Sequence, residues 1–251
     1  MKALITGASS GLGREMAKIL AEKNYDLVIV ARRKELLEEL KNEIGDKVKV
    51  EVETADVSVK DNCIKLFEKH KDVDLLINNA GFGLFGNFVE TDLDKELSMI
   101  ETNISGLHIL TKLYLQEMQK KDSGSIMNIS SIAGFMPAGP LMATYYATKS
   151  YVLSLTRAIN TELKKQNSNV KMYVLCPGPF DSNFFNVAGV HFGVKPMSSE
   201  AVAKYGIDKM LKGKTVIVPG FTNKMATSLV RFAPYGIFSN IVYKLQQAKN
   251  K

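Results

Sequence analysis

Short runs of β-branched and other apolar residues alternate along this chain with longer stretches in which apolar residues recur at helical spacing. The short runs lie at residues 3–6, 27–31, 48–54, 73–77, 125–129, 170–175 and 215–218. The amphipathic stretches include residues 12–23, 34–44, 60–70, 145–165 and 199–211. This alternation predicts an α/β fold in which helices cover both faces of a parallel sheet. The carboxyl ends of the strands would then form the edge that binds a ligand.

The same pattern predicts a single domain over residues 1–251, since neither a linker rich in serine, glycine and proline nor a short internal repeat interrupts it. One segment, at about residues 180–197, lacks periodicity and is longer than most loops in compact domains. We therefore expect it to be a loop that covers a substrate. A basic and apolar C-terminal segment lies at about residues 220–251.

The composition is that of a globular chain, and the distribution of charged residues argues against one class of binding partner. Apolar residues make up 45% and charged residues 24% of the 251 residues, close to the average for soluble domains. The formal net charge is +7, but residues 1–199 hold 24 basic and 24 acidic residues. Residues 200–251 hold nine basic and two acidic residues and therefore carry the whole excess. This argues against a nucleic-acid-binding protein, in which basic residues would spread over the main domain.

The cysteines and the longest apolar stretch indicate in which cellular compartment the protein is found. Cys63 and Cys176 lie far apart and match no metal-ligand spacing, so we expect neither a disulfide nor a metal site. Polar residues follow the first apolar run at once, so no secretory signal is expected. Residues 225–243 are broken by Arg231 and Pro234 and make a poor transmembrane helix. We therefore expect a cytoplasmic protein.

A glycine-rich turn, TGASSGLG at residues 6–13, follows directly after the first predicted strand. Glycines at this place allow a tight turn, a close approach of the backbone to phosphate, and close packing of helix on sheet. The free N–H groups of the helix that begins there would bind a pyrophosphate. We expect a dinucleotide site formed by Gly7, Ser9, Ser10, Gly11, Leu12 and Gly13, although a purely structural turn would have the same glycines.

The residues after the second predicted strand select the dinucleotide. An NAD site carries an acidic residue there, which accepts a hydrogen bond from the ribose 2′-hydroxyl. This chain has Arg32 and Arg33 instead, and Arg14 follows the glycine turn. Guanidinium groups bind a 2′-phosphate through charge-assisted hydrogen bonds. We therefore expect NADP(H), bound by Arg14 and Arg32, rather than NAD(H); the alternative is that the arginines form solvated surface.

Tyr145 and Lys149, four residues apart, are the candidates for acid/base chemistry. On a helix they share one face, and an ammonium beside a phenol lowers the pKa of the phenol. Tyr145 would then donate a proton to a carbonyl oxygen, or accept one in reverse. Tyr205 and Lys209 have the same spacing, but only the first pair follows Ser131, at the end of the fifth predicted strand. We expect the Tyr205 pair to be a solvated helix face.

Six short motifs occur in order along the chain: TGASSGLG at 6–13, NNAG at 78–81, TNISG at 102–106, NISS at 128–131, YYATK at 145–149 and PG at 177–178. In these motifs the chain resembles the short-chain dehydrogenase/reductase family over nearly its whole length. The resemblance implies a Rossmann-type sheet of about seven strands in the order 3-2-1-4-5-6-7. It also implies a homodimer or homotetramer, formed through helices around residues 94–121 and 145–165.

The resemblance also implies roles for single residues. Tyr145 would be the acid/base, Ser131 would hydrogen-bond the substrate carbonyl, and Lys149 would bind the nicotinamide ribose and lower the pKa of Tyr145. Asn103 would hold a water that links Lys149 to solvent. The cofactor would further contact Asp56, Asn79, Ala80, Gly81, Pro177, Gly178 and Ser182. Ser182 stands where the family commonly has threonine, and it keeps the hydroxyl that would hold the carboxamide.

The spacing of serine and tyrosine departs from the family's pattern. The serine usually lies thirteen residues before the tyrosine, whereas Ser131 lies fourteen before Tyr145. A bulge in residues 135–140 would absorb the extra residue. The neighbours are worse candidates, because Ile132 has no side-chain donor and Ser130 should face away by strand alternation.

The histidines and Cys176 have weaker claims to a function. His70, His108 and His191 lack metal-ligand spacing, and we expect the first two in solvent or on helix surfaces. His191 lies in the expected substrate loop, where it would contact substrate or solvent. Cys176 lies at the end of a strand, where we expect a small buried residue.

The expected substrate loop is apolar, with Phe180, Phe184, Phe185, Val187, Val190 and Phe192. An apolar cover excludes water during hydride transfer and suits a small-to-medium apolar ketone or aldehyde. Alternatively, these side chains pack on the body of the protein or on another subunit. The sequence thus favours an NADP(H)-dependent carbonyl reductase. Two alternatives stay open, a 3-oxoacyl-thioester reductase of lipid metabolism and an NADP-binding regulatory or scaffold protein.

The basic, apolar C-terminal segment allows three interpretations. It packs on the core or on a second subunit, covers the pocket, or lies as an amphipathic helix on a membrane surface. We favour the first of these.

Overall fold

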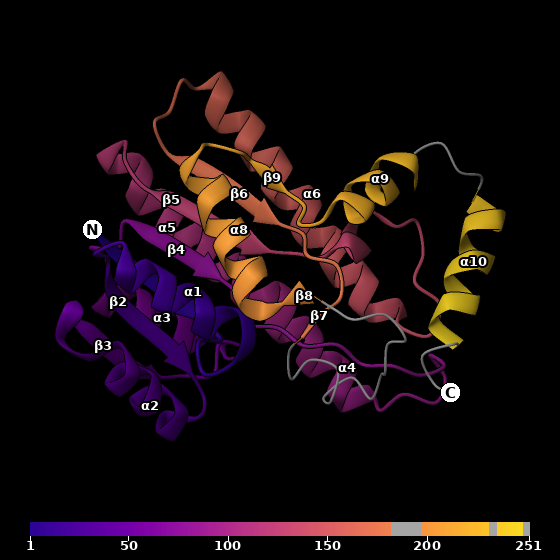
Figure 1. The fold of residues 1–251 in the computed structure, drawn as a ribbon, viewed down its shortest axis with the longest axis horizontal. Coiled ribbons are helices and arrows are strands. Elements are labelled where there is room, and N and C mark those ends of the chain that lie inside the picture. Colours follow the sequence, from indigo (N-terminus) through magenta and orange to yellow (C-terminus); the bar gives the residue numbers. More distant parts are fainter. Residues whose placement is uncertain (182–196, 231–234, 248–251) are drawn as a thin grey trace.

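The computed structural model describes residues 1–181, 197–230 and 235–247 (Figure 1). Seven parallel strands form one sheet in the order β3-β2-β1-β4-β5-β6-β9. They are β1 (Lys2–Thr6), β2 (Asp26–Ala31), β3 (Val50–Thr54), β4 (Leu75–Asn78), β5 (Ser125–Ile129), β6 (Lys171–Leu175) and β9 (Val216–Ile217). The expected fold and strand order are confirmed, with β9 as the seventh strand.

Helices cover both faces of this sheet (Figure 1). One face carries α1 (Gly11–Glu22), α2 (Lys34–Ile44) and α8 (Ser199–Leu211); the other carries α3 (Lys60–Lys69), α5 (Leu107–Lys121) and α6 (Ala143–Lys165). Successive residues of a strand point to opposite faces. Ile5 therefore packs with Met16 and Ile207 on the first face, and Leu4 packs with Leu66 and Tyr114 on the second.

The helix expected around residues 94–121 is divided into three parts. These are α4 (Leu93–Ile100), a π-helical turn η2 (Glu101–Gly106) and α5. The side chain of Asp92 caps α4 by accepting a hydrogen bond of 2.9 Å from the backbone N–H of Lys95. The π-helical turn contains Asn103, and such turns inside helices occur frequently at functional sites.

The segment at residues 180–197, which was expected to be a loop, begins and ends in two short strands that pair with each other. There β7 (Phe180–Asp181) pairs in parallel with β8 (Met197–Ser198). The residues between them, including Ser182 and His191, lie outside the described residues, so the expectations for that loop stay predictions. The chain continues after β9 as α9 (Phe221–Leu229) and α10 (Tyr235–Gln247). Among all the described residues, no helix is long and apolar enough to cross a membrane.

The environment of His70 differs from the one expected. Its side chain is only 1% exposed, because the end of α3 packs between β3 and α5. Nε2 of His70 lies 2.9 Å from a carboxylate oxygen of Glu53, and the His70 carbonyl accepts a hydrogen bond of 3.1 Å from the hydroxyl of Tyr114. His108 does lie on an exposed helix surface as expected, with Nδ1 2.7 Å from the hydroxyl of Tyr151.

Candidate active site

A cavity of about 710 Å³ runs along the carboxyl ends of the central strands. The glycine turn and the residues after β2 line one end, and the start of α6 and part of α10 line the other. Its lining includes most of the expected site residues, namely Gly7, Ser9, Ser10, Gly11, Leu12, Arg32, Asp56, Asn79, Ala80, Gly81, Ser131, Tyr145, Lys149, Pro177 and Gly178. Gly13, Arg14 and Asn103 lie outside this lining. The parallel topology thus gathers residues from six motifs at one edge of the sheet.

The glycine turn needs glycine for two reasons. Gly7 and Gly11 have φ of +68° and +54°, in the left-handed region that favours glycine. A Cβ on Gly7 would lie 2.9 Å from the Cα of Ala80, and one on Gly13 would lie 2.5 Å from the carbonyl oxygen of Gly7. Since neither neighbour is free to move, a larger residue at either position would push α1 away from the strand ends.

Asn79 joins the glycine turn to the end of β4. The hydroxyl of Thr6 accepts hydrogen bonds of 3.0 Å from the backbone N–H groups of both Asn79 and Ala80. In return, the Asn79 amide donates to the carbonyls of Thr6 and Gly7 at 3.0 and 3.2 Å. Asn79 therefore lines the cavity, while its amide nitrogen holds the turn in shape. The sequence analysis did not assign Thr6 this part, although it directly precedes Gly7.

The structure separates the three arginines. Arg33 donates to the hydroxyls of Ser9 and Ser10 at 3.0 and 3.2 Å and lines the cavity. Arg32 lines it too, with its side chain 71% exposed and 3.7 Å from a carboxylate oxygen of Asp56.

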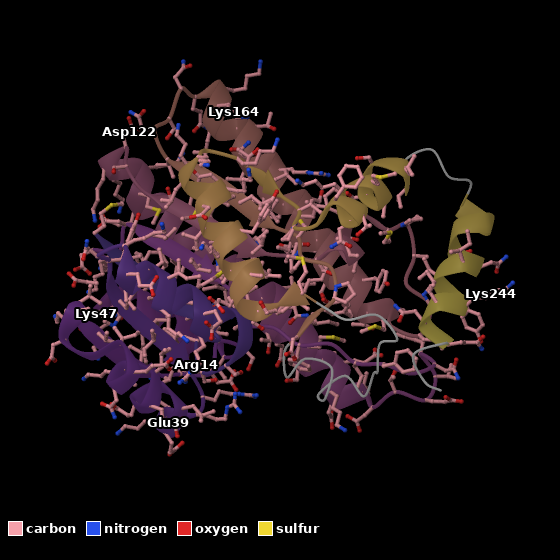
Figure 2. All side chains as sticks on the ribbon, viewed as in Figure 1. Arg14, Glu39, Lys47, Asp122, Lys164 and Lys244 are labelled. Atoms are coloured by element: carbon pink, nitrogen blue, oxygen red, sulfur yellow. The ribbon has the colours of Figure 1, made fainter. Side chains whose placement is uncertain are left out.

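Arg14 lies on the side of α1 that faces α2 (Figure 2), where it donates to Glu43 at 2.5 Å and to the carbonyl of Leu36 at 3.4 Å. Both partners belong to α2, which holds Arg14 outside the cavity. The expectation that Arg14 and Arg32 together face the cofactor is therefore corrected: the arginine beside Arg32 in the cavity is Arg33.

Asp56 is held in place at the same end of the cavity. One of its carboxylate oxygens accepts hydrogen bonds from the backbone N–H and the hydroxyl of Ser58 at 3.0 and 2.7 Å. Burial favours the neutral acid, but these bonds and the charge of Arg32 outweigh it and hold the pKa of Asp56 below its usual value. The carboxylate is therefore charged and already oriented at the place where the adenine is expected.

Tyr145, Ser131 and Lys149 meet at the other end. Tyr145 lies in the first turn of α6, and its phenol is hydrogen-bonded to the hydroxyl of Ser131. Lys149 follows one turn later, with its Nζ 5.8 Å from the centroid of the Tyr145 ring. That Nζ donates a hydrogen bond of 3.1 Å to the carbonyl of Ile129, at the end of β5.

Burial dominates the ionisation of this group. It raises the pKa of Tyr145 well above its usual value, against the opposing effect of the Ser131 hydrogen bond. It also lowers the pKa of Lys149 to about 8. The lowered pKa expected for Tyr145 beside Lys149 is thus not found, because desolvation of the phenolate has the largest effect on this pKa. Tyr145 is a neutral phenol at pH 7, which is the form that donates a proton.

Ser131 reaches Tyr145 despite the extra residue between them. It precedes a short 3₁₀ helix, η3 (Ile132–Phe135), and its hydroxyl accepts a hydrogen bond of 3.1 Å from the backbone N–H of Ala133. In the loop that follows, Leu141 has φ of +64°, an uncommon conformation for leucine. Ser130, which was expected to face away, also lines the cavity, but its buried hydroxyl donates to the carbonyl of Lys149 at 2.7 Å.

Asn103 connects three elements just behind the cavity. Its amide oxygen accepts a hydrogen bond of 3.1 Å from the backbone N–H of Phe82, and its amide nitrogen donates to the carbonyl of Phe82 and the hydroxyl of Thr148. A Cβ on Gly81 would lie 2.8 Å from the Asn103 amide oxygen and 3.4 Å from Nζ of Lys149. Asn103 thereby fixes the chain at Phe82 next to Lys149, and its expected role in holding a water stays a prediction.

Two residues at the substrate end were missed by the sequence analysis. Gln246 of α10 is 1% exposed and donates a hydrogen bond of 2.8 Å to the hydroxyl of Tyr146, and both line the cavity. Of the three interpretations of the C-terminal segment, the position of Gln246 supports the second, a pocket cover; the first, which we favoured, and the third stay predictions. The sequence offered one sign of this contact, the position of Tyr146 next to Tyr145, and none for Gln246.

The remaining expected residues have clear positions. Gly178 lies against α9, where a Cβ would lie 2.5 Å from the amide nitrogen of Asn223. Cys176 is fully buried, as expected. Tyr205 and Lys209 lie on α8 and do not line this cavity, in agreement with the choice of Tyr145 and Lys149. No cluster of potential metal ligands occurs within residues 1–181, 197–230 and 235–247.

Known proteins share both the sequence and the fold. A family model described as short chain dehydrogenase matches residues 1–189. An uncharacterized oxidoreductase of Staphylococcus epidermidis is 33% identical over 196 residues, which are 76% of this chain and 82% of that protein.

Among solved structures, a short-chain dehydrogenase from Sphingobium yanoikuyae in complex with NADPH is 27% identical, with a TM-score of 0.84 over 95% of each chain. A bulky-bulky ketone specific alcohol dehydrogenase from Comamonas testosteroni is 26% identical, with a TM-score of 0.79 over 92% of this chain and 91% of that one. A short chain dehydrogenase/reductase from Burkholderia phymatum in complex with NAD is 22% identical, with a TM-score of 0.82 over 91% and 92% of the chains, and so shares the fold.

Proposed function

Because this chain belongs to the short-chain dehydrogenase family of oxidoreductases, we propose that it interconverts an apolar ketone or aldehyde and the corresponding alcohol with NADP(H). One observation carries the proposal: the Ser131–Tyr145 hydroxyl pair lies beside Lys149 at one end of a cavity, and the glycine turn lies at the other end. Both ends belong to the same cavity, so one dinucleotide would be held at the glycine turn and beside Tyr145.

The residues present fit a nicotinamide dinucleotide. Gly7 and Gly11 leave space for a close approach of phosphate, and the N–H groups at the start of α1 would bind a pyrophosphate there. Arg32 and Arg33 supply cations for a 2′-phosphate at the end of β2, where an NAD site has a carboxylate. The dinucleotide, when bound, supplies the hydride of the reaction.

The side chains of the chain itself handle the proton. Ser131 donates a hydrogen bond to the substrate oxygen and positions it against the phenol of Tyr145. As the carbonyl carbon accepts the hydride, the phenolic proton of Tyr145 passes to that oxygen and gives the alcohol. The ammonium of Lys149 then stabilises the phenolate left behind, in a buried site where the charge of Lys149 acts with little screening.

The substrate end of the cavity is mainly apolar and supports an apolar carbonyl compound. Its lining includes Phe82, Leu84, Ile132, Met142 and Phe180. Tyr146 and Gln246 add a polar contact on one side. The solved relative that is specific for bulky-bulky ketones supports a ketone with bulky groups on both sides of the carbonyl.

The test measures consumption of NADPH with a panel of apolar ketones and aldehydes, with a 3-oxoacyl thioester for comparison. We expect turnover with at least one apolar ketone or aldehyde, and its loss in Tyr145→Phe. If NADPH binds but no carbonyl compound is reduced, the chain is a cofactor-binding protein and the proposal is wrong. Faster turnover of the thioester than of every ketone and aldehyde would also overturn the substrate class.

A further inference from the structure

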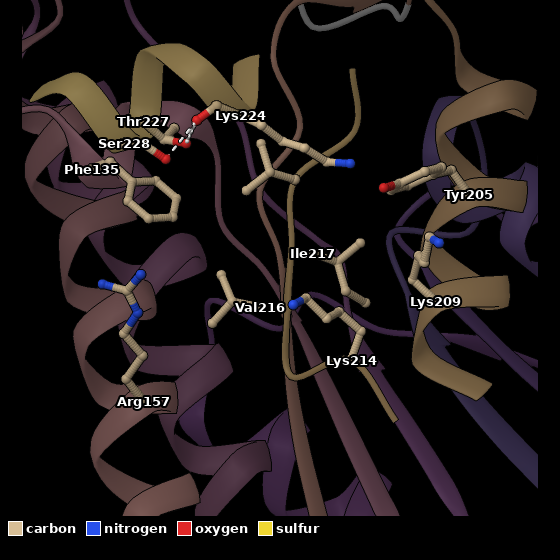
Figure 3. Close-up of a pocket in the computed structure, with 11 residues that line it drawn as sticks. Phe135, Arg157, Tyr205, Lys209, Lys214, Val216, Ile217, Lys224, Thr227 and Ser228 are labelled. Atoms are coloured by element: carbon tan, nitrogen blue, oxygen red, sulfur yellow. Dashed lines mark hydrogen bonds between the residues drawn. The ribbon is translucent and has the colours of Figure 1, made fainter. Parts of the chain in front are cut away.

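A second cavity, of about 800 Å³, lies at the β9 edge of the sheet between α6, α8 and α9 (Figure 3). Its lining comprises Phe135, Arg157, Tyr205, Lys209, Lys214, Val216, Ile217, Val218, Lys224, Thr227 and Ser228. None of these residues lines the active-site cavity. The proposed reaction therefore leaves this second cavity unexplained.

The second cavity is strongly basic. Arg157, Lys209, Lys214 and Lys224 all line it, and no carboxylate does. Within the described residues, none of the three lysines has a carboxylate oxygen within 4.0 Å. These lysines are three of the nine basic residues that give residues 200–251 the whole net charge of the chain. Like charges gathered around one hollow create a positive potential that attracts an anion.

Aromatic rings hold the cations in place. Lys209 and Lys224 lie over the same ring, that of Tyr205, at 5.5 and 5.4 Å from its centroid. On the opposite wall, the guanidinium of Arg157 lies 4.8 Å from the centroid of Phe135. Figure 3 shows Arg157 and Phe135 across the hollow from Tyr205 and Lys209. Cations arranged in this way lose less side-chain entropy when a ligand binds.

The residues on the floor and the roof of the second cavity limit which kinds of ligand would bind in it. Val216, Ile217 and Val218 line the floor, where an apolar or aromatic group is favoured over water. At the roof, the hydroxyls of Thr227 and Ser228 donate to the carbonyl of Lys224 at 3.0 and 2.9 Å and so fix the backbone that carries its ammonium. The volume is that of a typical small-molecule site and much larger than one phosphate ion needs.

We propose that this second cavity binds a small phosphorylated compound with an aromatic or apolar body. The phosphate groups would contact Lys209, Lys214, Lys224 and Arg157, and the body would lie between the rings of Tyr205 and Phe135 on the valine and isoleucine floor. Charge-assisted hydrogen bonds from several cations suit phosphate groups better than a single carboxylate. A competing explanation is that lysines beside the edge strand β9 only discourage pairing with another sheet.

The test is a calorimetric titration of the full-length protein with UDP, which carries an aromatic base and two phosphates, and with inorganic pyrophosphate. Three proteins are compared: the wild type, Lys209→Gln/Lys224→Gln, and Lys47→Gln/Lys164→Gln. Lys47 and Lys164 are exposed lysines at the ends of other helices (Figure 2), so the control variant loses the same charge.

We expect UDP to bind the wild type and the control alike, and about tenfold or more weakly to Lys209→Gln/Lys224→Gln. Pyrophosphate should bind more weakly than UDP, because it lacks the body. Absence of UDP binding to the wild type, or equal binding to all three proteins, would overturn the proposal. Equal affinity for UDP and pyrophosphate would overturn the part assigned to the rings. Since Lys209 and Lys224 lie outside the active-site cavity and the experiment measures binding, the result does not depend on the proposed reaction.

Discussion

Gln246, near the end of α10, donates a hydrogen bond of 2.8 Å to the hydroxyl of Tyr146, the neighbour of the proposed proton donor Tyr145. The two residues are 100 positions apart, and the Gln246 side chain is almost completely buried. Gly139 packs so closely on the other side of the Tyr146 ring that no Cβ would fit there. Part of the C-terminal helix α10 therefore lines the cavity, and a hydrogen bond joins it to the residue next to Tyr145.

Gln246→Ala should raise the KM for the carbonyl substrate by about threefold to tenfold, because it removes a buried hydrogen bond at the edge of the substrate site. The kcat should change little, since Tyr145, Ser131 and Lys149 are untouched. Steady-state kinetics with NADPH in excess measures both constants. Gln247→Ala is the matched control, because the Gln247 amide is exposed and donates to Tyr243 instead.

The effects of Gln246→Ala and Tyr146→Phe on KM should not add in the double variant, since each removes the same hydrogen bond. Strict additivity would show that the two side chains act independently on the substrate.

Tyr145→Phe and Ser131→Ala should each lower kcat by about 10² to 10⁴-fold, because they remove the proton donor and its hydrogen-bonded partner. The Kd for NADPH should stay the same within about twofold, which fluorescence titration measures. Tyr151→Phe provides a control on the same helix, since its hydroxyl contacts only His108 among the described residues. Unchanged kcat in Tyr145→Phe would assign the proton to another group.

Arg33→Ala should weaken NADPH binding by about tenfold or more and leave NADH binding nearly unchanged, because only NADPH carries the 2′-phosphate. Arg14→Ala should change neither Kd by more than about twofold, since its guanidinium pairs with Glu43 outside the cavity. Equilibrium titrations of both variants with both cofactors make the comparison. A loss of NADPH affinity in Arg14→Ala alone would restore the role that the sequence suggested.

Lys149 should make the protein more stable as the pH rises from 7 to 9.5. Its pKa is lowered by burial to about 8 in the folded chain and returns to its usual value near 10.5 on unfolding. Between these values the unfolded chain binds the extra proton, so the free energy of unfolding rises with pH, by about 2 kcal/mol over this range.

Lys149→Met should lack this contribution, whereas Lys164→Met, at an exposed position, should keep it. Urea denaturation at several pH values gives the free energies of unfolding. Parallel pH profiles for the wild type and Lys149→Met would show that Lys149 does not titrate in this range.

Much of the fold was predictable because it depends on local patterns. The alternation of buried strands and amphipathic helices predicted seven parallel strands, and strand-end residues at one edge followed from that topology. Glycines at 7, 11 and 13 predicted the turn, because φ values and close contacts there exclude side chains. Tyr145 and Lys149 share a helix face, and Ser131 at the end of the fifth predicted strand distinguished them from Tyr205 and Lys209, which have the same spacing.

The sequence by itself thus determined the sheet, the glycine turn and the tyrosine with its lysine, since each depends on residues a few positions apart. Only the tertiary structure decided that Arg33 lies in the cavity while Arg14 pairs with α2, that Gln246 lines the cavity, and that burial raises the pKa of Tyr145. It also decided that three lysines of residues 200–251 meet Arg157 around a second cavity. These outcomes depend on how helices distant in sequence pack against one another and on how much water they exclude, which no local pattern records.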